Sequence, residues 1–412
     1  MLATHTPPVP HAACLDELLS DSRLRTTPYL AAHVEAGAVF AARGGWLRPN
    51  HFGDPVAEQH ACREAVALFD VHSMGKMAVA GPEAGVLIER VAANTPPSEA
   101  GGAVYTTLCD PAGRMIDDVL IYRCTHEWFV MCGTMSRRIV AEHLRSCSDD
   151  LQATVRDVTA ERAYMALQGP RAWEVLSLWL GGRRDDVQHL RYYNCVELDM
   201  TDHHSGLDWC LVCRTGYTGE LGFELIVPVD QALAVWRSLR ELGRPFGLAL
   251  AGAAALQALR TEKGYRGFGA DIDRTMTPAE AGLGWTVRVA GRSVIGQEVL
   301  EQQSGAPADH CRVWPVITGA GVPVGAGVMR ADLPVGAGVM RADDNRVVGR
   351  ITSSAHSPTL DRHVGIALFA SPGWPGETPL CVGLDGLAPQ SITVGRRGFL
   401  DPNRDRLTVE LH

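Results

Sequence analysis

The spacing of apolar residues alternates along the chain between the period of two typical of strands and the period near 3.6 typical of helices. Strands are expected at 77–80, at 128–132, and in two hairpins, formed by 105–122 and by 209–212 with 223–227. Helices are expected at 55–68, 84–91, 137–144, 231–242 and 249–263. After about residue 305, short Val- and Ile-rich runs alternate with Gly and Pro, which is typical of a small β-barrel.

A strand, a Gly-Pro turn and a helix follow one another twice. Residues 79–84 read Val-Ala-Gly-Pro-Glu-Ala, and residues 167–172 read Leu-Gln-Gly-Pro-Arg-Ala. Two such units indicate paired α+β halves, and they lie too far apart in sequence for a solenoid.

These patterns predict an α+β fold in several parts. Residues 1–22, rich in Pro, Ala and Thr, are expected to form a loose leader. Residues 23–302 are expected to form two α+β sub-domains, and residues 305–412 the β-barrel. The polar stretch near 302–312 is the expected linker.

One decapeptide occurs twice without change, at 323–332 and at 334–343. Two copies make no solenoid, and one copy alone would satisfy the barrel, so the duplication is expected to lengthen a hairpin loop. Its Gly-x-Gly pairs lack the strand, the helix and the acidic residue of a dinucleotide site.

Composition narrows the functional classes. At 412 residues, more than one domain is the default expectation. A net charge of −9 argues against nucleic acid as the main partner. No apolar run has membrane-spanning length, and Met1–Leu19 shows no secretory pattern, so we expect a cytoplasmic protein without a membrane partner.

The 11 cysteines form no disulfide framework and read as reduced, mostly buried thiols. Cys210 and Cys213 have C-x-x-C spacing, but they lie within a strand-like run and lack a second pair or a histidine companion. Two buried strand cysteines are therefore expected, and His203-His204 is expected to be a polar loop. No metal site is predicted.

The stretch 214–225 has three glycines within seven residues between two apolar runs, which requires a tight turn or a close backbone approach. Glu220 and Glu224 flank that turn, and Glu224 falls in a Phe-Glu-Leu-Ile-Val strand pattern. A buried carboxylate needs a partner, and the adjacent N–H donors of a flat heterocycle such as a pterin would provide one. The alternative, favoured by this stretch alone, is a hairpin with an outward-facing Glu224.

Two adjacent carboxylates, Asp117 and Asp118, lie in an otherwise apolar strand pattern. Neighbouring strand residues face opposite sides, so one of them is expected to face inward and to need a functional partner. The alternative is one aspartate capping a turn and the other solvated.

The text Arg-Thr-Gly-Tyr-Thr-Gly-Glu-x-Gly-Phe-Glu at 214–224 resembles the glycine cleavage system T protein, a tetrahydrofolate-dependent aminomethyltransferase. It equally resembles the folate-binding parts of dimethylglycine and sarcosine dehydrogenases. Further matching segments include Asp117-Asp118, Leu259-Arg-Thr-Glu262 and Thr277-Pro-Ala-Glu280, and the resemblance covers roughly residues 25–407.

The resemblance implies a cloverleaf of three sub-domains around a central folate cavity. It implies that Asp117 is the catalytic aspartate, that Glu224 holds the pterin edge, and that Tyr217 and Arg260 belong to the cofactor site. Three departures bear on the family's site: His72-Ser73 stands where the family has Ser-His, Cys132 replaces an Asn, and the arginine that T proteins carry a few residues before Arg260 is absent.

The function that the resemblance implies is transfer of a one-carbon unit to tetrahydrofolate to give methylene-tetrahydrofolate. The donor is either an aminomethyl group on a lipoyl carrier protein or a small molecule. One alternative is a folate-dependent demethylase of an N-, O- or S-methyl compound that acts with a separate flavin oxidase, since no flavin domain is visible. The other is a non-catalytic folate-binding protein.

Overall fold

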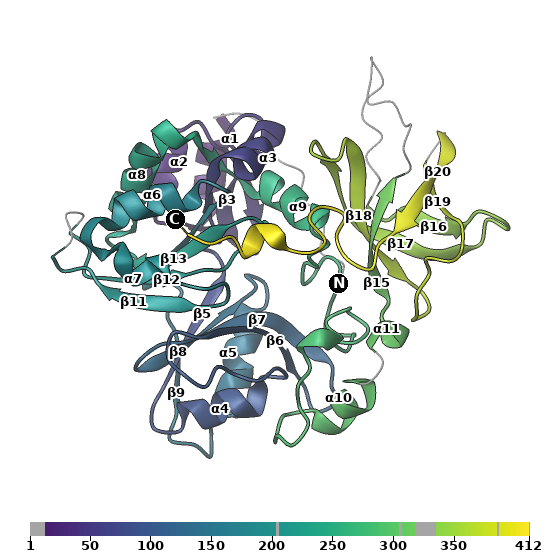
Figure 1. The fold of residues 1–412 in the computed structure, drawn as a ribbon, viewed down its shortest axis with the longest axis horizontal. Coiled ribbons are helices and arrows are strands. Elements are labelled where there is room, and N and C mark those ends of the chain that lie inside the picture. Colours follow the sequence, from purple (N-terminus) through teal and green to yellow (C-terminus); the bar gives the residue numbers. More distant parts are fainter. Residues whose placement is uncertain (1–12, 203–205, 305–306, 319–334, 385–386, 412) are drawn as a thin grey trace.

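A computed structural model describes residues 13–202, 206–304, 307–318, 335–384 and 387–411. Figure 1 shows three lobes: two mixed lobes formed by the N-terminal two thirds of the chain, and a third formed by the C-terminal strands. The predicted α+β architecture with a C-terminal barrel is confirmed.

The first lobe is built on a mostly antiparallel six-stranded sheet. Its strands, in spatial order, are β11 (Cys195–Asp199), β12 (Trp209–Cys213), β13 (Gly222–Pro228), β10 (Arg162–Gln168), β4 (Val66–Asp70) and β14 (Leu248–Ala251). A small sheet of β1 (Arg25–Thr26), β3 (Trp46–His51) and β2 (Val39–Arg43) belongs to the same part of the chain.

The second lobe is built on an antiparallel five-stranded sheet. Its strands, in spatial order, are β6 (Ala103–Cys109), β7 (Met115–Arg123), β8 (Glu127–Cys132), β5 (Gly75–Ala80) and β9 (Thr154–Asp157). The hairpin predicted for 105–122 is therefore the β6–β7 pair.

The two sheets pack face to face, and helices cover their outer faces. The shared core between the sheets includes Tyr122 and Phe129 from one sheet and Tyr164 and Ile226 from the other. Helices α2 (Leu30–Glu35), α6 (Ala172–Leu180) and α8 (Ala232–Gly243) cover the six-stranded sheet, and α4 (Ala84–Val91) and α5 (Arg137–Ser146) cover the five-stranded sheet. The order of layers is thus helix, sheet, sheet, helix.

The two Gly-Pro turns have the same structural cause. Gly81 and Gly169 have φ values of 116° and 134°, which side chains rarely adopt. At both positions an added Cβ would come within 2.5 Å of a backbone oxygen. Each turn delivers the chain from a central strand, β5 or β10, to the helix that covers that strand's sheet.

The third lobe is a closed barrel of six strands. These are β15 (Val313–Thr318), β18 (Arg362–Phe369), β17 (Val347–Ser357), β16 (Gly338–Arg341), β19 (Leu380–Leu384) and β20 (Leu387–Val394). Helix α9 (Ala253–Glu262) packs against β17 and β18. The C-terminal segment then returns to the first lobe, where Leu411 joins the core of the six-stranded sheet (Figure 1).

Several predicted boundaries need correction. The helix expected at 55–68 is α3 (Pro55–Glu64), and β4 begins at Val66 because a Val-Ala-Leu-Phe run suits a fully buried strand. The helix expected at 249–263 begins only at Ala253, after strand β14. Part of the expected leader forms α1 (Ala13–Ser20), in keeping with its run of helix-forming residues.

The expected linker also contains regular secondary structure. Helices α10 (Gln297–Ser304) and α11 (Pro307–His310) occupy most of it, and the first barrel strand begins at Val313. The short α7 (Asp185–Gln188) lies between α6 and β11. In the ranges that the structure describes, no helix is long and apolar enough to cross a membrane.

The second copy of the duplicated decapeptide supplies strand β16, whereas the first copy lies outside the described residues. Deleting Pro323–Leu333 joins Val322 to Pro334 and leaves one intact copy of the decapeptide after Val322. The connection from β15 to β16 becomes roughly half as long, which changes its closure entropy by only about 0.6 kcal/mol.

We therefore expect the deletion variant to keep its melting temperature within about 2 °C of the parent. Differential scanning calorimetry on both proteins measures this. Loss of the barrel, seen as aggregation or a missing transition, would show that the first copy is structurally required.

Candidate functional site

Glu224 lies on β13 and faces the space between the two sheets. It is 6% exposed, and its Oε2 accepts hydrogen bonds from the hydroxyls of Thr215 and Tyr122, the latter at 3.1 Å. Burial raises the pKa of Glu224, and these hydroxyl contacts oppose that rise. Within the described residues no Lys or Arg forms an ion pair with this carboxylate, so its partners are neutral. The outward-facing alternative is excluded, because Glu224 is buried.

Asp118 lies on β7 and faces the same inter-sheet side. Leu120 and Tyr122, which follow on that face of the strand, pack against the six-stranded sheet. The hydroxyl of Tyr105 donates to Oδ2 of Asp118 at 2.6 Å. Burial raises the pKa of Asp118, while this hydrogen bond lowers it.

Asp117 points to the opposite face of β7, on the side where α4 and α5 cover the sheet. It is 0% exposed, and its Oδ2 accepts a hydrogen bond from the backbone N–H of Gly133 at 2.8 Å. Its Oδ1 is a buried atom without a hydrogen-bond partner among the described residues. Burial, and secondarily the charge of Asp118, raises the pKa of Asp117 well above its usual range. The structure thus separates the aspartate predicted to be catalytic from Glu224.

Aromatic side chains connect the two inward-facing carboxylates. Burial raises the pKa of Tyr193, and the charge of Glu224 adds to this rise. Burial and the charge of Asp118 raise the pKa of Tyr105, and Tyr217 and Tyr193 add to this rise. Tyr193 is also a non-glycine residue with φ of 61°, a costly conformation that clusters at functional sites.

Residues from the other segments complete this centre. Trp285 stacks on Tyr105 with ring centroids 5.7 Å apart and is 41% exposed. The Arg404 guanidinium, from the returning C-terminal segment, lies 5.7 Å from the centroid of the Trp285 ring. The centre thus presents aromatic faces and one exposed cation beside the two carboxylates. We call this set the central site: Tyr105, Asp118, Tyr193, Tyr217, Glu224, Tyr265, Trp285 and Arg404.

Tyr217, which the family resemblance assigns to the cofactor site, lies in the central site. It is 37% exposed, stacks on Tyr265 with centroids 5.8 Å apart, and donates its hydroxyl to the carbonyl oxygen of Arg266. An aromatic pair that is fixed at one end and open at its face offers a flat ligand a stacking surface.

Arg260 does not present its guanidinium to the central site. It is 2% exposed and donates to Gln257, the carbonyl of Tyr265, Asp271 and Ser353. Asp271 is also held by the hydroxyls of Thr352 and Ser353 on β17. The structure therefore gives Arg260 a joining role between α9 and the barrel, and all three of its nitrogens are already used by the protein.

Two of the family departures, His72-Ser73 and Cys132, lie away from the central site. His72 is 3% exposed, packs edge-on against Trp46 at 5.3 Å, and has its pKa lowered to about 3 by burial. Ser73 contacts Arg48 and Thr134 at 3.0 Å each. Cys132 is fully buried opposite Gly75, on the same side of the sheet as Asp117. All three serve the structure around the five-stranded sheet.

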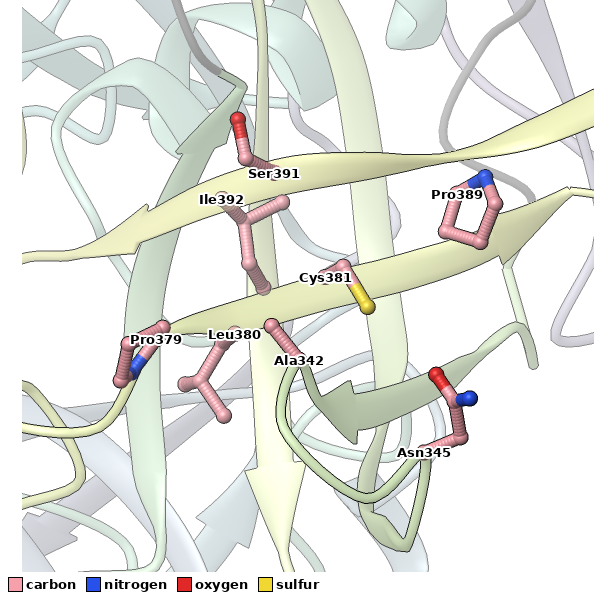
Figure 2. Close-up of a pocket in the computed structure, with 8 residues that line it drawn as sticks. All are labelled: Ala342, Asn345, Pro379, Leu380, Cys381, Pro389, Ser391 and Ile392. Carbon is pink, nitrogen blue, oxygen red and sulfur yellow. The ribbon is translucent and has the colours of Figure 1, made fainter.

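The barrel carries a separate hollow of about 500 Å³ (Figure 2). It is lined by Leu380, Cys381, Ser391 and Ile392 from β19 and β20, with Ala342 and Asn345 after β16. No carboxylate lines it, and none of the central-site residues contributes to it. It is a shallow surface depression lined by both polar and apolar side chains.

Sequence reasoning did not single out Tyr193, Trp285 or Arg404 as site residues, and it preferred Asp117 to Asp118 as the catalytic candidate. The sequence gives a weak indication of the aromatic residues, because Tyr192-Tyr193 and Trp285 lie among residues that are typical of turns. The sequence gives no such indication of Arg404, because its position depends on the path of the C-terminal segment.

Comparison with known proteins identifies the family of the chain. Residues 29–291 match the GCVT N-terminal domain, and residues 324–401 match the glycine cleavage T-protein C-terminal barrel domain. The chain therefore belongs to the glycine cleavage T-protein family, which confirms the resemblance found in its motifs.

Its relatives cover nearly the whole chain. An aminomethyltransferase from Moorella thermoacetica is 32% identical over 350 residues, which are 84% of this chain and 90% of the relative. An aminomethyltransferase from Desulforamulus reducens is 30% identical over 351 residues, 85% of this chain and 91% of the relative. The crystal structure of the glycine cleavage system aminomethyltransferase T from Bartonella henselae has the same fold, with a TM-score of 0.78 at 23% identity over 92% of this chain and 98% of that one.

The buried pair of Arg260 and Asp271 predicts a large stability effect. Arg260→Ala leaves Asp271 as a buried charge without its cation, so the free energy of unfolding should fall by about 3–5 kcal/mol. The matched control is Arg237→Ala, which removes an exposed ion pair to Glu35 and should cost less than about 1 kcal/mol. Urea unfolding of the three proteins compares them, and equal losses would contradict the assigned role of Arg260.

Proposed function

We propose that this protein is a tetrahydrofolate-dependent aminomethyltransferase whose central site binds the folate and holds the reacting atoms. The observation that carries the proposal is the pair of carboxylates, Glu224 and Asp118, which face the same inter-sheet space from two different sheets. They stand in a chain that belongs to the T-protein family. The product would be methylene-tetrahydrofolate.

The residues of the central site fit a pterin. Glu224 is buried with hydroxyl partners alone, so a ligand that offers two adjacent N–H donors would complete its environment. Tyr217 and Tyr265 supply a stacking surface for a flat ring. Arg404 is an exposed cation at the same centre, suited to the carboxylate end of a folate. Arg260, whose nitrogens are used by the protein, is not part of this proposal.

Tetrahydrofolate would supply the nucleophilic nitrogen that accepts the one-carbon unit. The protein's contribution is electrostatic: Asp118, in low-dielectric surroundings, would stabilise positive charge as it develops on a reacting nitrogen. The Tyr105 hydroxyl orients the Asp118 carboxylate and can carry a proton between that carboxylate and the open centre. The two side chains thus hold and move a proton at a fixed position.

The donor that family membership supports best is an aminomethyl group on a lipoyl carrier protein, with ammonia as the second product. The demethylase alternative requires an N-, O- or S-methyl small molecule and a separate flavin oxidase. A non-catalytic folate-binding protein would need Glu224 but not Asp118, so the Asp118 variant below also separates binding from catalysis.

The role of Glu224 is tested by binding. Glu224→Gln replaces a charge-assisted acceptor by a mismatched amide, so tetrahydrofolate binding should weaken by about 1–3 kcal/mol. The control is Glu161→Gln, whose side chain is 61% exposed in a surface ion pair and should bind as the parent does. Isothermal titration measures both, and unchanged affinity in Glu224→Gln would remove this residue from the site.

The choice between the two aspartates is tested by turnover. Asp118→Asn removes the charge at the central site, so turnover should fall roughly 100-fold or more while folate affinity stays similar. Asp117→Asn should have a much smaller effect, because burial favours the uncharged form that Asn imitates. Formation of methylene-tetrahydrofolate from an aminomethyl-loaded lipoyl carrier protein is the assay.

The opposite order of effects would return the catalytic role to Asp117, as the family motif first implied. Normal turnover in both variants would contradict any aspartate mechanism on β7. An absence of turnover in the parent with this donor, together with tight folate binding, would favour one of the two alternatives.

A further inference from the structure

Three buried thiols meet between the two sheets, outside the proposed chemistry. Cys124 follows β7, Cys195 begins β11, and Cys213 ends β12; their exposed fractions are 5%, 3% and 0%. All three belong to the buried cluster that the two sheets share. In the part of the chain that the structure describes, no group of three His, Cys, Asp or Glu side chains is arranged to hold a metal ion. The cluster therefore calls for an explanation by thiol chemistry.

The strand register places Cys195 directly opposite Cys213. The next pair along, Asn194 and Arg214, is hydrogen-bonded, with the Arg214 N–H donating to the Asn194 oxygen at 2.9 Å. The Cys195 N–H instead turns away from β12 and donates to Gly101 at 2.7 Å. Cys195 and Cys213 are thus a non-hydrogen-bonded antiparallel pair.

Such a pair has its Cα atoms about 4.5 Å apart, with the two side chains close together on one face of the sheet. Disulfides join residues whose Cα atoms are about 4.4–6.8 Å apart. The backbone of β11 and β12 therefore already has a spacing that a disulfide between Cys195 and Cys213 requires. No comparable register relation links Cys124 to either of the other two thiols.

Cys195 is the member of the cluster best suited to react first. Contact with the Cys124 and Cys213 thiols lowers its pKa to about 5, which favours the nucleophilic thiolate. It also lies on β11, the edge strand of the six-stranded sheet. Edge strands open locally at lower cost than central strands, and such opening would admit a small oxidant.

We propose that Cys195 and Cys213 form a reversible intramolecular disulfide when the protein meets a peroxide. The Cys195 thiolate attacks one oxygen of hydrogen peroxide, giving a sulfenic acid and hydroxide. The Cys213 sulfur then displaces the hydroxyl group from that sulfenic acid, forming the S–S bond and releasing water. Two thiols are oxidised, and one peroxide is reduced to two waters after the hydroxide takes up the released proton.

The position of the bond links it to the central site. Cys213 pairs across the strands with Glu224, and Thr215, two residues further on, donates its hydroxyl to the Glu224 carboxylate. A disulfide replaces the Cys213 thiol beside this carboxylate by a fixed S–S bond directed at Cys195, and so changes the packing around Glu224 and its donor Thr215. This consequence, unlike the disulfide itself, rests on the proposed function of Glu224: oxidation should weaken folate binding.

The disulfide is tested by mass spectrometry on the full-length protein. The folded protein is treated with hydrogen peroxide, its remaining thiols are alkylated, and the digest is searched for cross-linked peptides. We expect one Cys195–Cys213 cross-link that dithiothreitol reverses. Cys195→Ala and Cys213→Ala should each abolish it. Cys124→Ala should retain it, as should the control Cys210→Ala, since Cys210 lies on the same strand but faces the other layer.

A Cys124–Cys195 cross-link, irreversible oxidation of Cys195 without a disulfide, or eleven free thiols at peroxide doses that leave the fold intact would each overturn the assignment. Circular dichroism checks the fold of each variant, and Cys→Ser replacements serve where an Ala variant is unstable.

Tetrahydrofolate titration of the reduced and oxidised protein then tests the link to the site. We expect affinity to fall at least about fivefold on oxidation, to return with dithiothreitol, and to be insensitive to peroxide in Cys213→Ala. A disulfide that leaves affinity unchanged would overturn the link alone. Failure of the reduced parent to bind folate would overturn the proposed function while leaving the disulfide result intact.

Discussion

The candidate site depends on the packing of two β-sheets against each other. Because side chains alternate along a strand, this packing turns Asp118 on β7 and Glu224 on β13 toward one shared space and turns Asp117 away from it. Burial makes the two inward-facing carboxylates, Asp118 and Glu224, costly unless a partner is present, and their partners within the protein are hydroxyl groups. Because neither carboxylate has a cationic partner among the described residues, this space is a candidate binding site for a ligand with N–H donors.

Hydrogen bonds between distant segments fix the third lobe and the C-terminal segment beside that space. Arg260 and Asp271 bind α9 to the barrel strand β17, and the returning C-terminal segment is held by Arg214 through the carbonyls of Leu407 and Val409. That segment carries Arg404 to the central site. The barrel thus contributes to the site through the C-terminal segment that follows it. The hollow in the barrel, drawn in Figure 2, is lined by none of the central-site residues.

Sequence predicted the features that depend on local pattern. The β6–β7 hairpin, the strand around Glu224 and the barrel follow from alternation and turn residues, and the motifs correctly indicated the family. Alternation shows that Asp117 and Asp118 face opposite sides, but only packing decides which side is the site. The family resemblance implied a place for Arg260 in the cofactor site, whereas its contacts with Asp271 and with Ser353 of β17 are not apparent from local sequence. The positions of Tyr193 and Arg404 likewise depend on contacts between distant segments.

The most direct test is a crystal structure of the protein with tetrahydrofolate. The account predicts a pterin whose N–H edge lies within hydrogen-bonding distance of the Glu224 carboxylate. It also predicts Asp118 and Tyr105 beside the reacting nitrogens, and no contact with Asp117. A folate bound in the barrel hollow, or one that reaches Asp117 from the helix-covered side of the five-stranded sheet, would contradict it.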